Sequence, residues 1–245
     1  MEGNLPLTYI IAEAGTGHYD ADHFVRREKA WALTKAAKAA GADAVKFQAF
    51  FDEPLFCPYE GDEKRWERWE KTLLTGPAWC DLLEQTDRIG IDLLLSVFSQ
   101  QGIALLKEMK PRYIKVASRA AKTFPYDELE GPFLVSTGME PSCVRPRSAF
   151  WLQCDAAYPC RMRQWHRLYD GLSDHSGTIW PGMDAIFGGA EFLEVHFTIP
   201  GTDPGPDAPV CLTLEQLKLL TGARDAVATM RGNVGGEQKE NTGAS

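Results

Sequence analysis

The sequence has no excess of basic residues, no paired cysteine motif and no long apolar run near its start. Its 245 residues carry 26 Lys and Arg against 34 Asp and Glu, a formal net charge of −8. A nucleic-acid-binding protein needs a basic stripe to neutralise phosphates, and no such stripe offsets the acidic balance here. The charge balance therefore argues against this class of protein. It does not exclude a small anionic ligand held by a few placed lysines.

Cysteine usage and the first residues predict the compartment. None of the six cysteines forms a Cys-x-x-Cys pair, and Met1–Leu7 contains neither a basic segment nor an apolar run. We therefore expect no targeting or membrane-spanning segment, and reduced thiols in a cytoplasmic protein. The cysteines are Cys57, Cys80, Cys143, Cys154, Cys160 and Cys211.

What the sequence does contain is a regular alternation of apolar strands with helix-length segments. A chain of this length with 44% hydrophobic residues suits one α/β barrel, which typically needs about 250 residues. The pattern predicts a (β/α)₈ TIM barrel over residues 1–231, followed by a disordered polar tail over 232–245. The expected strands are 8–12, 44–48, 91–98, 112–118, 132–138, 150–154, 171–177 and 194–198. The expected helices are 26–40, 77–88, 102–109, 179–190 and 212–227.

Two connections are too short for a regular barrel. Residues 139–149 and 159–169, after the fifth and sixth strands, leave little room for helices, and the first contains Pro141 and Pro146. We expect the helical ring to be incomplete there and to expose apolar surface that a homodimer partner covers. The opposite irregularity is a long insertion over 51–75. Its charged run, 62–71, predicts a solvated surface helix.

Two histidines stand where predicted strands end. His175 and His196 follow parallel strands joined by one crossover helix, so both lie at the same edge of the sheet. With Asp174 and Glu194 beside them, the imidazoles suit a divalent metal. The alternative is that each histidine only caps a strand end by hydrogen bonding.

Polar residues end all eight strands, and a barrel of this class has its active site at those ends. Two lysines among several hydroxyls suit a phosphate, because they combine positive charge with hydrogen-bond donors. A metal nearby suits polarisation of a carbonyl oxygen, and Glu13 suits proton transfer. The strand-end residues are Glu13, Lys46, Gln48, Ser96, Lys115, Ser118, Ser136, Thr137, Tyr158, Ser173, Asp174, His175, Glu194 and His196.

Eight short motifs occur in register along the chain. They are Ile-Ala-Glu-Ala-Gly-x-Gly-His, Gly-Ala-Asp-Ala-Val-Lys-Phe-Gln, Ile-Lys-Val-Ala-Ser, Ser-Thr-Gly-Met, Cys-x-x-x-Tyr-Pro, Leu-Ser-Asp-His, Val-His-Phe-Thr and Pro-Gly-Pro-Asp. In this order, over residues 10–220, they resemble the sialic acid synthase family. Each motif alone is weak, but the set in register is specific.

The resemblance implies a reaction and a set of roles. The family condenses phosphoenolpyruvate with the open-chain aldehyde of an N-acylated amino sugar, releases phosphate, and uses Mn²⁺ or Mg²⁺. By resemblance, Glu13 is the acid and base of the reaction, and His175 and His196 are the metal ligands and catalytic residues. The implied phosphoenolpyruvate contacts are Lys46, Ser96, Lys115, Ser118, Ser136 and Ser173. The implied remaining contacts are Gln48, and Tyr158 and Asp207 toward the sugar.

The departures from the family pattern gather on the sugar side. Ala156 replaces a polar residue that the family places near the sugar. We also expect this protein to lack the family's C-terminal antifreeze-like domain, which contributes an arginine to the partner's site. We therefore expect an altered acceptor. The other departures are Gly17, Ser96-Val-Phe-Ser99, Arg119-Ala120, Gln153 and Val195.

Two alternatives remain. One is another metal-assisted carbon–carbon bond-forming enzyme on the same barrel. The other is a catalytically silent barrel that binds phosphoenolpyruvate or a sugar. The presence of Glu13 together with both histidines favours an enzyme, because a binding protein has no need of that trio.

Overall fold

Eight parallel strands form the centre of the molecule. The computed structural model describes residues 7–51, 53, 55–56, 63–138 and 148–232. Neighbouring strands are hydrogen-bonded in the order β3-β2-β1-β8-β7-β6-β5-β4, and every pairing is parallel. The two end strands, β3 and β4, lie in contact, so the sheet curls into a nearly closed barrel. The strands are β1 (Tyr9–Gly15), β2 (Ala44–Ala49), β3 (Asp92–Val97), β4 (Ile114–Val116), β5 (Phe133–Ser136), β6 (Ala149–Cys154), β7 (Gly171–Asp174) and β8 (Phe192–His196).

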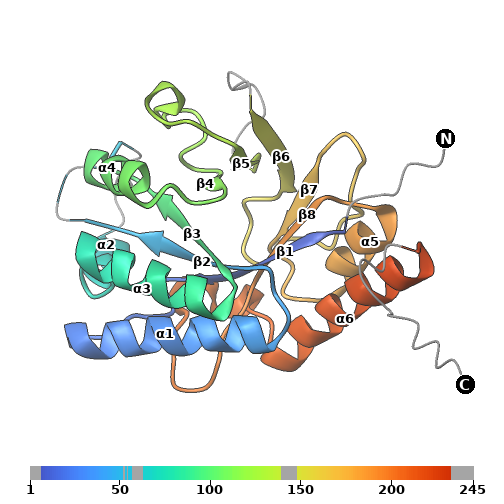
Figure 1. Ribbon diagram of the computed structural model, residues 1–245, viewed down its shortest axis with the longest axis horizontal. Coiled ribbons are helices and arrows are strands. Elements are labelled where there is room, and N and C mark those ends of the chain that lie inside the picture. The colour runs from blue at the N-terminus through green and yellow to red at the C-terminus, as the bar shows by residue number, and fades with distance from the viewer. Residues whose placement is uncertain (1–6, 52, 54, 57–62, 139–147, 233–245) are drawn as a thin grey trace, which may run out of the picture.

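Helices cover one part of the barrel wall and leave another bare. Figure 1 shows helices beside β1–β3 and beside β7 and β8, whereas loops flank β4–β6. This confirms the predicted (β/α)₈ barrel with an irregular ring. The helices are α1 (His23–Ala39), α2 (Glu63–Glu70), α3 (Gly76–Ile89), α4 (Gln100–Met109), α5 (Trp180–Gly188) and α6 (Leu214–Met230), with 3₁₀ turns η1 (Tyr126–Glu128) and η2 (Gly205–Val210).

Local sequence explains where the helices begin and end. The side chain of Asp22 accepts hydrogen bonds from the backbone at the start of α1, three residues before the predicted start. Thr213 and Gln216 form the predicted capping box of α6. Gly90, in the left-handed conformation, ends α3.

The part of the barrel wall without helices is larger than predicted. Residues 155–170, between β6 and β7, contain no helix, as expected. Residues 117–132, between β4 and β5, hold only the turn η1, which the sequence did not predict. The predicted gap at 139–149 and the predicted tail at 232–245 fall largely outside the described residues. Beside β6 and β7, the 155–170 loop encloses an outer cavity of about 390 Å³ in place of a packed helix.

The charged helix of the insertion is not merely solvated. α2 exists as predicted, but its Trp69 is 5% exposed and stacks on Phe50, with ring centroids 4.4 Å apart. Phe50 stacks in turn on Phe98, which follows β3. The expectation of a purely solvated helix was wrong because one face of α2 packs over the end of the barrel.

The interior of the barrel changes from apolar to polar along each strand. One buried cluster fills the N-terminal half: Ile11, Ala44, Leu94, Leu134, Leu152 and Phe192. Residues two positions further along a strand point the same way, so each strand next presents a side chain into the same interior. Those next residues are Glu13, Lys46, Ser96, Ser136, Cys154 and Glu194. The fold therefore puts ionisable and hydroxyl groups in a layer at the C-terminal ends of the strands.

The four cysteines in the described part of the chain, Cys80, Cys154, Cys160 and Cys211, are free thiols. Within the described ranges, no helix has the length and apolar character needed to cross a membrane.

Candidate active site

Two lysines and two glutamates form a buried charged network inside the barrel. Lys46 Nζ lies 2.9 Å from Glu13 Oε2 and 2.8 Å from Glu194 Oε1. Lys115 Nζ lies 3.1 Å from the other oxygen of Glu194 and donates to Ser136 Oγ at 2.8 Å. Each of these charged side chains is at most 4% exposed. Strands β1, β2, β4 and β8 each contribute one of the four.

Burial and mutual attraction decide the charge of these groups. Burial raises the pKa of Glu13 to about 7, against the opposing effect of Lys46. Burial also opposes ionisation of Glu194, but Lys115 and Lys46 outweigh it and hold that pKa well below its usual range. With Glu13 protonated, two lysines and one carboxylate remain, so the network carries one net positive charge. It is then suited to an anionic ligand.

Glu194 has a different place from the one expected from the sequence. The sequence predicts it beside the histidines at a metal site, whereas the structure pairs it with both lysines. Asp174 also fails to join the site, because it accepts hydrogen bonds from the Ser176 backbone and hydroxyl and lines the outer cavity. The alternation along β8 was the available signal, since it puts Glu194 and His196 on the same inward face.

The two histidines converge, as predicted. His175 Nε2 lies 3.0 Å and His196 Nε2 3.5 Å from the Tyr158 hydroxyl, and the imidazole centroids are 5.2 Å apart. His175 Nδ1 donates to the Asp155 carbonyl at 2.6 Å, which leaves the lone pair on Nε2. Burial lowers the pKa of His175 to about 4 and that of His196 to about 3, so both rings are neutral at pH 7.

These two imidazoles fit a metal ion as a pair of nitrogen donors. Neutral rings with convergent Nε2 atoms, one fixed by a backbone carbonyl on its other nitrogen, are what metal ligation requires. In the part of the chain that the structure describes, no group of three or more His, Cys, Asp and Glu side chains gathers as a metal site. Any further ligands would therefore come from water or substrate, as is usual for Mg²⁺.

Asp207 and Gln48 approach the same place from the barrel mouth. Asp207 Oδ2 lies 3.6 Å from His196 Nδ1. A β-carbon on Gly15 would stand 2.9 Å from Asp207 Oδ2 and 3.8 Å from Gln48 Nε2. Gly15 has φ +54, so both its conformation and this close approach favour glycine. The glycine at the end of β1 thus lets the side chains of Asp207, Gln48 and Glu13 share one corner.

A cavity of about 260 Å³ opens at this mouth. It contains four predicted site residues, Gln48, Ser118, Tyr158 and Asp207, and also Ala156. Sequence reasoning missed Arg68 and Trp69 of α2, which reach the cavity from an insertion with no motif of its own. The remaining lining residues are Thr16, Phe98, Ala117, Arg119 and Pro206.

Four buried polar atoms of the site have no hydrogen-bond partner among the residues that the structure describes. Glu13 Oε2 and Glu194 Oε2 still form ion pairs with lysines, whereas Ser96 Oγ and Glu13 Oε1 have neither kind of partner there. A buried polar group without a partner is costly, so such atoms mark places where a ligand or water supplies the missing bond. Ser173 is buried on β7, opposite Glu194 in the ladder. His18, although part of a motif, lies apart from the site and contacts Phe47, Trp79 and the Thr72 carbonyl.

Comparison with known proteins decides the family. The NeuB family model matches residues 33–235, which is most of the chain. The chain belongs to the NeuB family. The N,N'-diacetyllegionaminic acid synthase of Legionella pneumophila is 29% identical over 267 residues, covering 91% of this chain and 73% of that protein. The enzyme of the same name from Campylobacter jejuni is 26% identical, over 87% of this chain and 74% of that one.

The fold of this NeuB-family chain recurs in solved structures. The N-acetylneuraminic acid synthetase of Leptospira borgpetersenii superposes with a TM-score of 0.73. The match covers 97% of this chain and 89% of that one at 20% sequence identity. At that identity the likeness establishes the barrel fold alone, which agrees with the strand order found here.

Proposed function

We propose that this chain is a phosphoenolpyruvate-dependent synthase. It condenses phosphoenolpyruvate with an aldehyde sugar, either an N-acylated amino sugar or a related aldehyde, to form a sialic-acid-like 2-keto acid and phosphate. The observation that carries the proposal is the buried network of Lys46, Lys115 and Ser136, with Glu13 and two convergent histidines at its edge. Membership of the NeuB family and the names of its relatives support the same class of reaction.

The charged network holds the phosphoenolpyruvate. Its carboxylate and phosphate take positions near Lys46 and Lys115, where two ammonium groups attract them. The orphan hydroxyl of Ser96, with Ser118, Ser136 and Ser173, donates hydrogen bonds to the same oxygens. Glu194 keeps both lysines charged and in place when no phosphoenolpyruvate is bound.

Glu13 moves the protons. C3 of the enol attacks the aldehyde carbon, and protonated Glu13 gives its proton to the aldehyde oxygen, which becomes a hydroxyl. The Glu13 carboxylate then takes a proton from the water that adds at C2. The resulting tetrahedral centre breaks its C2–O bond to phosphate, and the proton of its C2 hydroxyl passes to the departing phosphate. This leaves a ketone and hydrogen phosphate, and Glu13 ends the cycle protonated. A pKa near 7 suits both roles.

His175 and His196 are the residues that would hold Mn²⁺ or Mg²⁺. When bound, the ion supplies Lewis-acid polarisation of the aldehyde oxygen. The acceptor lies at the mouth of the barrel, above the two histidines, and is oriented there by Tyr158, Gln48 and Asp207.

The acceptor is expected to differ from N-acetylmannosamine. Ala156 lines the cavity and offers no side-chain hydrogen bond where the family has a polar residue. We expect clear binding of phosphoenolpyruvate in the presence of Mn²⁺ by calorimetry, but slow or no phosphate release with N-acetylmannosamine. Efficient turnover of that sugar by this chain would show that the substitutions around Ala156 do not govern acceptor choice. No binding of phosphoenolpyruvate would contradict the proposed function itself.

The bare wall of the barrel supports a homodimer. On the 155–170 loop, Met162 is 61% and Leu168 81% exposed, so apolar side chains do reach the surface where the helical ring is incomplete. We expect a dimer in sedimentation velocity at micromolar concentration. Replacing Leu168 with Asp should shift the dimer toward monomer, while the same change at Leu219, an exposed residue of α6 on the helical side, should not. A wild-type chain that sediments only as a monomer would overturn this expectation.

A further inference from the structure

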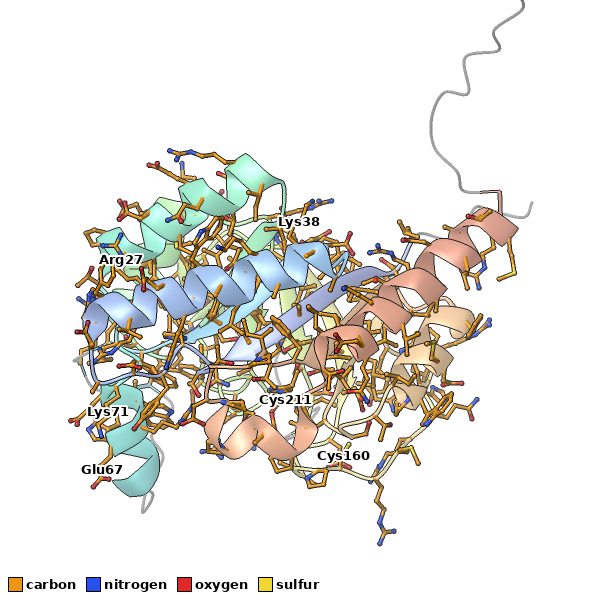
Figure 2. All side chains as sticks on the ribbon, turned by 90° about the horizontal axis from the view of Figure 1, so that it is seen from below. Arg27, Lys38, Glu67, Lys71, Cys160 and Cys211 are labelled. Atoms are coloured by element: carbon orange, nitrogen blue, oxygen red, sulfur yellow. The ribbon has the colours of Figure 1, made fainter. Side chains whose placement is uncertain are left out.

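Arg68, on the insertion helix α2, reaches from the surface into the mouth of the barrel. Its side chain is 12% exposed and lines the mouth cavity. It contacts two loops from opposite ends of the sequence, the loop after β1 and the loop after β8. In Figure 2, α2 with its labelled Glu67, and Lys71 just after its end, lies along the same edge of the molecule as the segment leading to Cys211.

The first loop follows the catalytic end of β1. Arg68 Nε donates to Thr16 Oγ1 at 3.2 Å and Nη2 donates to the Thr16 carbonyl at 3.3 Å. The guanidinium also stacks over Tyr19, 4.4 Å from its ring centroid. Thr16 is the next residue after Gly15, so Arg68 ties α2 directly to the corner where Glu13 and Gln48 lie.

The second loop carries Asp207. Arg68 Nη1 pairs with Asp203 Oδ2 at 2.9 Å, and Nη2 donates to the Asp203 carbonyl. The guanidinium lies so close to Gly205 that a β-carbon there would stand 2.3 Å from Cζ. Gly205 has φ +60 as well, so both its conformation and the packing of the guanidinium on the loop favour glycine.

The turn between Asp203 and Asp207 is short and internally hydrogen-bonded. The Gly205 N–H donates to Asp203 Oδ1 at 2.8 Å, and the Asp207 N–H donates to the Pro204 carbonyl at 3.3 Å. A displacement of Asp203 is therefore transmitted to Asp207. Asp207 in turn has little freedom, because its carboxylate rests over Gly15 and beside His196.

We propose that Arg68 is a positioning residue for acceptor recognition: it clamps the 203–207 turn onto the end of β1 and so holds Asp207 over the site. The role rests on the proposed function, in which Asp207 orients the aldehyde sugar. An arginine suits this clamp because its rigid planar fork spreads its donors over a carboxylate and the backbone carbonyls of two loops, whereas the donors of a lysine all sit on one nitrogen. Phosphoenolpyruvate binds deeper, among the lysines, and is not affected.

Hydrogen–deuterium exchange tests the clamp without any knowledge of the acceptor. In Arg68→Ala, and less so in Arg68→Lys, amides of residues 199–210 and 15–19 should exchange faster than in the wild type. Arg27→Ala is the matched control, because Arg27 of α1 forms an exposed ion pair with Asp81 of α3. Arg27 lies on the side of α1 that points away from α2 (Figure 2). Unchanged exchange over 199–210 in Arg68→Ala would overturn the proposal.

Kinetics test its consequence. The probe is whichever aldehyde in a sugar panel gives the fastest phosphate release with the wild type. Arg68→Ala should raise KM for that aldehyde, or lower kcat/KM for it, by about ten- to a hundredfold, the effect of losing hydrogen bonds to a charged group. KM for phosphoenolpyruvate should stay within about twofold. Equal losses for both substrates would contradict a role confined to the acceptor.

Asp203 provides the second variant, since its side chain is 53% exposed and its replacement spares the core. Asp203→Asn should reproduce the acceptor effect, and the double variant should be no worse than Arg68→Ala, because the two residues act as one unit. Additive losses would show that they act separately and would overturn the clamp. A wild type that releases no phosphate with any aldehyde would refute the proposed function, while the exchange experiment would still decide the clamp.

Discussion

Glu194→Gln should destabilise the protein more than any other single isosteric change in the barrel. The variant keeps the shape of the side chain but removes the negative charge that Lys46 and Lys115 share. Lys46 retains Glu13, whereas Lys115 loses the only carboxylate with which it pairs among the described residues. Leaving a buried charge without its partner typically costs about 3–5 kcal/mol. We expect a loss of this size in the free energy of unfolding, measured by urea denaturation.

A second substitution should reverse part of that loss. Adding Lys115→Met to Glu194→Gln removes the uncompensated charge, and neutral buried replacements for an ion pair are often tolerated. The double variant should therefore be more stable than Glu194→Gln alone. Glu84→Gln is the control, because the Glu84–Arg88 pair is about 70% exposed on both sides and its loss should have little effect. A Glu194→Gln variant as stable as the wild type would show that the network does not carry the charges assigned to it.

His196→Ala should abolish turnover while leaving the fold intact. His196 is one of two imidazoles whose Nε2 atoms converge, so its removal leaves a single nitrogen donor for the metal. Phosphate release should fall below detection, with the circular dichroism spectrum unchanged. His23→Ala, at the exposed start of α1, should remain fully active.

Metal removal should give the same loss reversibly. A chelator should stop phosphate release by the wild type, and added Mn²⁺ should restore it. The chelator should have no further effect on His196→Ala, because that variant has already lost the site. Full activity of the wild type in metal-free buffer would contradict the assignment of His175 and His196 as ligands.

The barrel and most of the candidate site could be predicted because the alternation of inward and outward side chains along a strand is visible in a short stretch of sequence. Glu13, Lys46, Ser96 and Glu194 each follow an apolar residue by two positions, and parallel strands bring such positions to the same end. The pairing of Glu194 with both lysines could not be predicted. It joins Glu194 to Lys115 and to Lys46, the second of which is 148 positions away in the chain, and depends on how far each strand is staggered around the barrel.

The insertion was misjudged for a related reason. Its charged sequence is typical of a solvated helix, and nothing local marks Trp69 or Arg68 as different from their neighbours. Trp69 stacks on Phe50, the residue after β2, and Arg68 pairs with Asp203, 135 residues away. The hydrophobic periodicity of a segment cannot predict contacts that its side chains make with residues far away in the sequence.

The most direct test of the central claim is the product of the reaction. Phosphoenolpyruvate, Mn²⁺ and a panel of N-acylated amino sugars and related aldehydes should be incubated with the wild-type chain and analysed by mass spectrometry, with phosphate measured in parallel. The account predicts that at least one aldehyde gains the elements of pyruvic acid, with one phosphate released for each product molecule. Phosphoenolpyruvate that binds but is never consumed with any aldehyde, or phosphate released without a new carbon–carbon bond, would contradict it.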